Sequence, residues 1–125
     1  MIPFNRLNID HKELHQLKKV FKKNSFQNGG SFTKNCEELI NKTIKIKKTI
    51  LTHSCTGALE MSAILSNINI GDQIIIPSNT FSSTANAFAL RGAELVFSDC
   101  SYETLNIEPS HIEKLITKKT KCIVV

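Results

Sequence analysis

Residues 48–65 read KTILTHSCTGALEMSAIL: an apolar run, a turn of small polar residues, and then a series of helix formers. The run 48–52 has strand character, and 58–65 is expected to form a helix. Ser54 or Thr56 would cap that helix. Free N–H groups in the first helical turn, the nearby hydroxyls and the positive end of the helix dipole together predict a phosphate-binding site.

An ordinary Ser/Thr helix cap explains the same turn, because short hydroxyl-rich turns recur by chance. The surrounding pattern favours a ligand site. Strand-like runs follow at 73–76 and 94–97, separated by helical stretches, which is the alternation of a parallel α/β sheet. Polar residues follow each predicted strand, at 53–56, 78–80 and 98–99. These positions are the carboxyl ends of strands, where open α/β sheets bind their ligands.

The chain of 125 residues has the size of one domain. A fourth strand begins at 121–125, and the sequence stops inside it on two valines, whereas a natural terminus is usually polar or tied to a finished element. We therefore interpret the chain as incomplete. It is expected to contain an amino-terminal helical segment at 1–47 and the first part of an α/β domain at 48–125.

The net charge of +5 comes from clusters of lysines. Only Arg6 and Arg91 are arginines, no aromatic residues alternate with the lysines, and no recognition motif for nucleic acid occurs. Solvated helix faces therefore explain the lysines better than a nucleic-acid partner does. Such a surface would still attract a phosphate-bearing substrate.

The four cysteines lie far apart and match no metal or redox spacing, so we expect reduced thiols. The sequence shows no secretory signal and no apolar run long enough to cross a membrane. These features predict a cytoplasmic protein without a membrane partner.

Three further helices are expected from apolar periodicity. The first spans 11–23, is capped by Asp10 and packs by the stripe of Leu14, Leu17, Val20 and Phe21. A loop with Gly29 and Gly30 precedes the second, which Thr33 caps and which turns Cys36, Leu39 and Ile40 inward. The third follows the strand at 73–76, ends at Gly92 and buries the stripe of Phe81, Ala85, Phe88 and Ala89.

Two groupings of reactive side chains do not predict a site. His11 and His15 have a zinc-compatible spacing, but no third ligand accompanies them, so no metal is expected. The run His53-Ser54-Cys55 has no orienting acid, and adjacent side chains point in different directions, which argues against a hydrolase. No Walker-type phosphate loop occurs.

Several ordered motifs resemble those of the DegT/DnrJ/EryC1/StrS family of sugar aminotransferases. The likeness is strongest to the branch that forms dTDP-4-amino-4,6-dideoxygalactose for enterobacterial common antigen. It rests on 1–5, 29–33, 54–59, 71–81, 85–87, 91–93 and 104–107, and so spans essentially the whole chain. The resemblance implies an α/β fold: the amino-terminal part of the large domain of an aspartate-aminotransferase-type (fold type I) enzyme, with a mainly parallel sheet flanked by helices. Asn79 stands where relatives tend to carry a bulkier residue, which leaves the sugar specificity less secure.

The resemblance also implies pyridoxal 5′-phosphate (PLP) as cofactor. Its phosphate would sit on Ser54, Cys55 and Thr56, and Phe81 would lie against one face of the pyridine ring. Phe81 also begins an apolar stripe, so a place in the core is the alternative. Asp99, at a strand end, fits a turn or cap at least as well as a ligand contact.

The implied reaction transfers the amino group of L-glutamate to the C4 ketone of dTDP-4-dehydro-6-deoxyglucose, in a homodimer. In the family, the Schiff-base lysine and the aspartate that pairs with the pyridine nitrogen lie beyond the point where this sequence stops. No catalytic residue is therefore assigned here, and this chain alone is expected to be inactive. The alternatives are another sugar-nucleotide aminotransferase of the family, a noncatalytic remnant, or a nucleic-acid-binding module.

Overall fold

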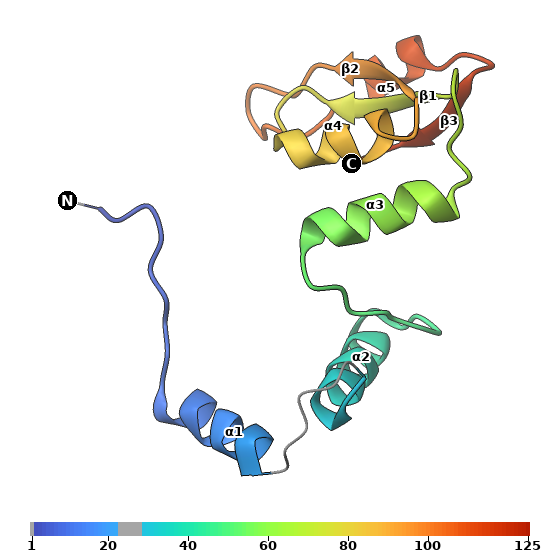
Figure 1. Cartoon of the computed structure of the whole chain (residues 1–125). Helices are drawn as coiled ribbons and strands as arrows, with labels where there is room; N and C mark the ends of the chain where they lie inside the picture. The colour runs from blue at the N-terminus through green and yellow to red at the C-terminus, as the bar shows by residue number, and fades with distance from the viewer. Residues whose placement is uncertain (1, 23–28) are drawn as a thin grey trace. The chain divides into compact units, whose positions relative to one another are not determined.

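The computed structural model describes residues 2–22 and 29–125. The chain divides into two compact units, Met1–Leu51 and Thr52–Val125 (Figure 1). The predicted domain boundary after residue 47 concerns the whole protein and stays a prediction.

The first unit contains α1 (His11–Lys22) and α2 (Ser31–Ile44). Asp10 caps α1 as predicted: its Oδ1 accepts from the N–H groups of Lys12 at 2.7 Å and Glu13 at 3.2 Å. The Glu13 carboxylate in turn accepts from the Asp10 N–H at 2.5 Å, which completes a capping box. Local sequence signals therefore fix the start of this helix.

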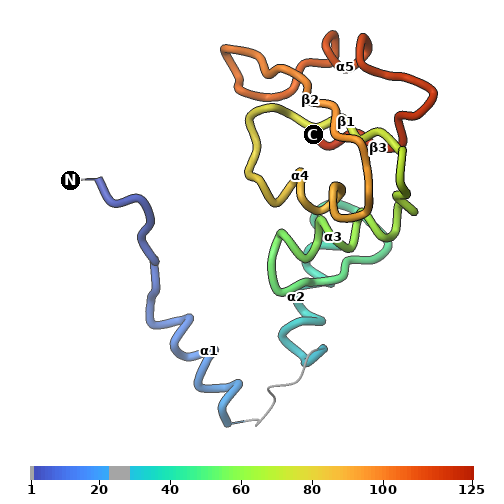
Figure 2. Tube along the Cα trace, turned by 45° about the horizontal axis from the view of Figure 1, so that its top comes forward, coloured from blue at the N-terminus to red at the C-terminus, as the bar shows by residue number. Residues whose placement is uncertain are grey.

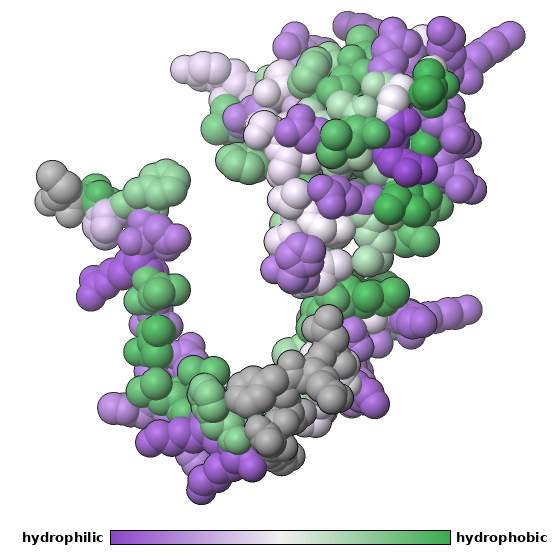
Figure 3. Space-filling model, viewed as in Figure 1, coloured by the Kyte–Doolittle hydropathy of each residue, from purple (hydrophilic) through white to green (hydrophobic). Residues whose placement is uncertain are grey.

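The predicted packing of both helices is wrong for the residues described, because neither α1 nor α2 contains a buried residue. Apolar side chains remain on the surface along 2–9 and α1 (Figure 3). Leu39 of α2 is 64% exposed, and Cys36 is exposed as well. The predicted Thr33 cap is also wrong: Gly30 is the N-cap, and Thr33 lies inside the helix. Gly30 adopts an extended conformation, and α2 begins three residues earlier than expected.

The predicted strand at 48–52 is absent from the structure. A strand requires a neighbouring strand to satisfy its backbone, and no described segment pairs with this one. Side chains of α2 bond to the segment instead. The Leu51 N–H donates to the Glu37 carboxylate at 3.1 Å, and the Thr49 hydroxyl donates to the Asn41 side-chain oxygen at 2.7 Å.

The second unit alternates helices and strands, as predicted. It runs α3 (Cys55–Leu65), β1 (Gln73–Pro77), α4 (Ser82–Ala89), β2 (Glu94–Ser98), α5 (Pro109–Leu115) and β3 (Thr120–Ile123). The described strands form one parallel sheet in the order β2-β1-β3, so β1 is central. α4 and α5 lie on opposite sides of this sheet (Figure 1, Figure 2). The sequence analysis missed α5, a short helix whose clearest signal is Pro109 in its first turn.

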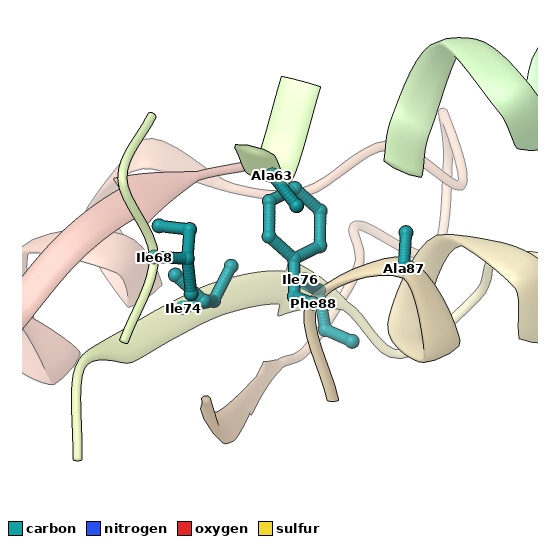
Figure 4. Close-up of a cluster of buried hydrophobic side chains, with 6 residues drawn as sticks. All are labelled: Ala63, Ile68, Ile74, Ile76, Ala87 and Phe88. Atoms are coloured by element: carbon teal, nitrogen blue, oxygen red, sulfur yellow. The ribbon is translucent and has the colours of Figure 1, made fainter. Parts of the chain in front are cut away.

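The core forms where α3 and α4 meet the central strand (Figure 4). Ile74, Ile75 and Ile76 of β1 are all 0% exposed. Each buried isoleucine contributes about 1.5–3 kcal/mol relative to an exposed one. The cluster in Figure 4 consists of Ala63, Ile68, Ile74, Ile76, Ala87 and Phe88. A fully apolar central strand is typical of a parallel sheet covered on both faces.

The predicted stripe of α4 is right in part. Phe88 is buried and Ala85 half-buried, but Phe81 and Ala89 are exposed. The helix begins at Ser82, after Phe81, and its buried face is centred on Thr84, Ala87 and Phe88. The hydroxyl of Thr84 is satisfied at 3.0 Å from that of Thr80, which offsets the cost of burying it.

The turn after α4 requires a glycine at position 92. Gly92 has a φ of +83°, a conformation that L side chains rarely adopt. A Cβ there would also lie 2.5 Å from Cγ1 of Ile70. The N–H of Gly92 donates to the Ala89 carbonyl at 2.8 Å, so this glycine closes the end of α4 as predicted.

Candidate functional site

The turn that begins α3 presents unused hydrogen-bond donors. Ser54, one of the two predicted caps, is the N-cap, and its Oγ accepts from the Gly57 N–H at 3.0 Å. The hydroxyl of Thr52 donates to the Ser54 carbonyl at 2.7 Å and braces the turn from the other side. The N–H groups of Cys55 and Thr56 have no acceptor within the helix, because both belong to its first turn. This is the geometry that suits an anion at a helix N-terminus.

The polar runs after β1 and β2 lie at neighbouring carboxyl ends, as predicted. Pro77 of β1 pairs with Ser98 of β2, and the Ser78 N–H donates to the Ser98 carbonyl at 2.9 Å. Ser98 itself is buried, with 1% of its surface exposed. The polar run 53–56 differs, because no strand precedes it in the structure.

A cavity of about 570 Å³ nevertheless joins the α3 turn to the carboxyl end of β1. Cys55 and Leu59 line it from α3, and Asn79 and Thr80 line it from the segment after β1. The rest of the lining comes from Pro77, Thr84, residues 105–107, Pro109, Ile112, Val124 and Val125. The lining therefore mixes polar side chains, among them Asn79, Thr80 and Asn106, with apolar ones such as Leu59 and Ile112.

Only Cys55 of the four predicted cofactor-binding residues lines this cavity. Ser54 and Thr56 flank Cys55 in the same turn, both exposed. Phe81 is the N-cap residue of α4 and is 77% exposed, so it is not part of the core of this unit. Its contact with a cofactor ring stays a prediction.

Sequence reasoning missed the contribution of Leu105, Asn106 and Ile107 to the cavity wall. Leu105 has a φ of +58°, and its N–H donates to the Ser101 carbonyl at 2.8 Å, so these residues form a tight turn after β2. Their sequence carries no chemical signature of a site. The place of this turn in the cavity wall depends on the folded sheet, which a local pattern does not reveal.

Asp99 lies apart from this cavity. It lines a separate cavity of about 180 Å³ with Phe97, His111, Lys114 and Leu115. Asp99 caps no described helix, since the N-cap of α5 is Glu108. Within 2–22 and 29–125, no cluster of His, Cys, Asp and Glu could hold a metal ion. In that same part of the chain, no helix has the length and apolar character to cross a bilayer.

Residues 7–125 match the DegT/DnrJ/EryC1/StrS aminotransferase family. The spore coat polysaccharide biosynthesis protein SpsC of Bacillus subtilis is 41% identical over 78 residues, which is 62% of this chain and 20% of SpsC. The curated relative therefore extends well beyond the matched region.

Solved structures agree with this assignment. The aminotransferase TlmJ of Streptoalloteichus hindustanus superimposes with a TM-score of 0.88 at 30% identity, over 94% of this chain and 32% of TlmJ. Spr1654 of Streptococcus pneumoniae, described as a sugar aminotransferase and solved in a PLP form, gives a TM-score of 0.87 at 27% identity, over 98% of this chain and 31% of Spr1654. These matches confirm the predicted fold class, the first part of a fold type I aminotransferase. The chain belongs to the DegT/DnrJ/EryC1/StrS aminotransferase family.

Proposed function

We propose that the protein that contains these residues is a PLP-dependent sugar-nucleotide aminotransferase. Membership of the family supports the reaction class, and the solved PLP form of Spr1654 supports the cofactor. The observation that carries the proposal is the α3 turn, which has free N–H groups and of which Cys55 lines a 570 Å³ cavity. A helix start with unused donors fits the phosphate group of PLP.

Three residues of the turn would hold the phosphate. The N–H groups of Cys55 and Thr56 point out of the helix start, and Ser54 keeps them in place through its cap. The Thr56 hydroxyl is exposed and has no hydrogen-bond partner among the described residues, so it can donate as well. The helix dipole adds only about 0.3–1 kcal/mol, so charge-assisted hydrogen bonds provide most of the binding.

Phe81 would cover one face of the pyridine ring. It sits at the start of α4, directly after the polar run that follows β1, and its ring is largely exposed. An exposed aromatic ring directly after Thr80, which lines the cavity, supports stacking better than a core role. PLP, when bound, supplies the electron sink that lets an amino group leave one substrate and join another.

The finer proposal names the substrates. L-glutamate donates the amino group and leaves as 2-oxoglutarate, and the C4 ketone of dTDP-4-dehydro-6-deoxyglucose receives it. The product, dTDP-4-amino-4,6-dideoxygalactose, serves the synthesis of enterobacterial common antigen or a related lipopolysaccharide. The motifs at 54–59 and 71–81 support this branch. The complete protein would act as a cytoplasmic homodimer.

None of the lysines in this chain takes the role of the Schiff-base lysine, because none lies in the matching motif of the family. The activity therefore belongs to the product of the full reading frame that contains these residues. Reading the coding DNA past the codon for Val125 is the first step of the test. A family-type lysine downstream supports the proposal, and an immediate stop codon favours a noncatalytic remnant.

The decisive experiment incubates that product with L-glutamate and dTDP-4-dehydro-6-deoxyglucose and identifies the amino sugar by mass spectrometry and NMR. We expect amination at C4 and an equimolar yield of 2-oxoglutarate. Thr56→Val and Phe81→Leu should weaken PLP binding, whereas Thr43→Val and Phe32→Leu in α2 serve as matched controls. Amination of a different sugar nucleotide would move the protein to another branch, and failure to bind PLP would refute the proposal.

A further inference from the structure

The imidazole of His53 lies against Gly57 at the start of α3. A Cβ built on Gly57 would lie 2.9 Å from Cε1 of His53, 3.4 Å from Nδ1 and 3.5 Å from Nε2. His53 directly precedes the N-cap Ser54, and Gly57 is the third residue of the helix. The ring therefore occupies the space that a side chain at position 57 would need.

The backbone does not explain the glycine at position 57. The described glycines with positive φ are Gly29, Gly71 and Gly92, and Gly57 is not among them. Glycine is a poor helix former, so alanine would suit a helical position better. A Cβ at position 57 would require the exposed ring of His53 to move away from the helix start.

The contact between His53 and Gly57 lies at the turn that begins α3, where the free N–H groups are. The Gly57 N–H is the group that bonds to Ser54 Oγ at 3.0 Å, and the ring of His53 lies beside this glycine. Thr52 holds the other side of the turn through its bond to the Ser54 carbonyl at 2.7 Å. The free N–H groups of Cys55 and Thr56 belong to the turn that these two hydrogen bonds hold.

We propose that His53 is a positioning residue for the phosphate-binding turn, and that Gly57 is glycine in order to admit its ring. The inference rests on the proposed function, since it assigns a task to a residue beside the proposed phosphate site. His53 acts by holding the turn in its binding-competent form. A ring that merely stabilised the helix would change the melting temperature without changing the preference for a phosphate.

The test compares PLP with pyridoxal, which lacks the phosphate, in the product of the full reading frame. Dissociation constants and melting temperatures are measured for the wild type, His53→Ala, Gly57→Ala and the double variant. His15→Ala, which removes an exposed histidine of α1, is the matched control. Because apparent affinity scales with the fraction of binding-competent turn, we expect His53→Ala to weaken PLP about fivefold to tenfold and to leave pyridoxal unchanged.

Gly57→Ala separates positioning from stability. Its Cβ displaces the ring, so PLP should weaken as in His53→Ala, while the better helix propensity of alanine holds or raises the melting temperature. In the His53→Ala background the same change should have no further effect on PLP, because residues in contact are not additive.

Two different results would overturn the inference. If the ratio of PLP to pyridoxal affinity is the same in His53→Ala as in the wild type, His53 does not position the turn, and the proposed function stands. If the wild type itself does not prefer PLP over pyridoxal, the phosphate does not bind at this turn, and both proposals fail together.

Discussion

The two units of the chain contain equally regular helices but differ in what they bury. In the second unit, the three isoleucines of β1 are fully buried, and Ile74 and Ile76 belong to a cluster with residues of α3 and α4. In the first unit, α1 and α2 bury no residue, although α1 has a well-formed capping box. Caps and periodicity are local properties, whereas burial requires a partner surface. The proposed site lies in the unit that has its own core.

The largest expected effect comes from emptying that core. Phe88→Ala should cost about 3–5 kcal/mol, because it removes a large buried side chain and leaves a cavity. Leu17→Ala in α1, where the side chain is 53% exposed, should cost far less. Urea unfolding of the 125-residue chain, followed by circular dichroism, measures both. Equal losses in the two variants would contradict the contrast between the units.

Gly29 in the first unit and Gly92 in the second test whether packing differs between the two units. Gly92 and Gly29 both have positive φ, but a Cβ would collide with Ile70 at Gly92 and meet nothing within 4 Å at Gly29. Gly29→Ala should therefore cost only backbone strain, about 1 kcal/mol, and Gly92→Ala should cost more, about 2–3 kcal/mol. Denaturant midpoints of the two variants give the difference. A larger loss at Gly29 would mean that packing does not distinguish the two turns.

The two side-chain caps should be nearly equal in strength. Asp10→Ala and Ser54→Ala each remove an acceptor for N–H groups of a first helical turn and should cost about 0.5–2 kcal/mol. The consequences should differ in extent. In Asp10→Ala, faster hydrogen exchange should be confined to α1, because α1 has no buried residue. In Ser54→Ala, faster exchange should extend into the core, because α3 contributes the buried Ala63. If Asp10→Ala also speeds hydrogen exchange beyond its own helix, as far as Ser54→Ala does, then α1 is coupled to a core.

Local patterns account for most of what the sequence predicted correctly. The capping residues Asp10 and Ser54, the apolar run of β1 and the closing glycine at position 92 act within a few neighbours. The strand expected at 48–52 failed because a strand exists only through pairing, and pairing is not encoded in the run itself. The stripe of α4 shifted because the helix starts one residue later than its apolar pattern.

In the candidate site, too, local features could be predicted from the sequence, whereas features that depend on the folded chain could not. Ser54, Cys55 and Thr56 were recognisable, since a hydroxyl-rich turn before a helix has a direct chemical meaning. Leu105 and Val124 also line the cavity, but they are apolar and come from distant parts of the sequence. The contact between His53 and Gly57 was also beyond a sequence pattern, because it depends on the orientation of one ring.

The smallest expected effect tests whether charge contributes to the contrast between the units. His111 and Glu108 of the second unit lie 3.8 Å apart, with side chains 37% and 41% exposed. An exposed pair of this kind is worth about 0–0.5 kcal/mol, because solvent screens it and two side chains must be ordered. Glu108→Gln should therefore leave the urea midpoint of the 125-residue chain unchanged, at low and at high salt alike. A marked, salt-dependent loss would mean that surface charge, and not burial alone, gives the second unit its stability.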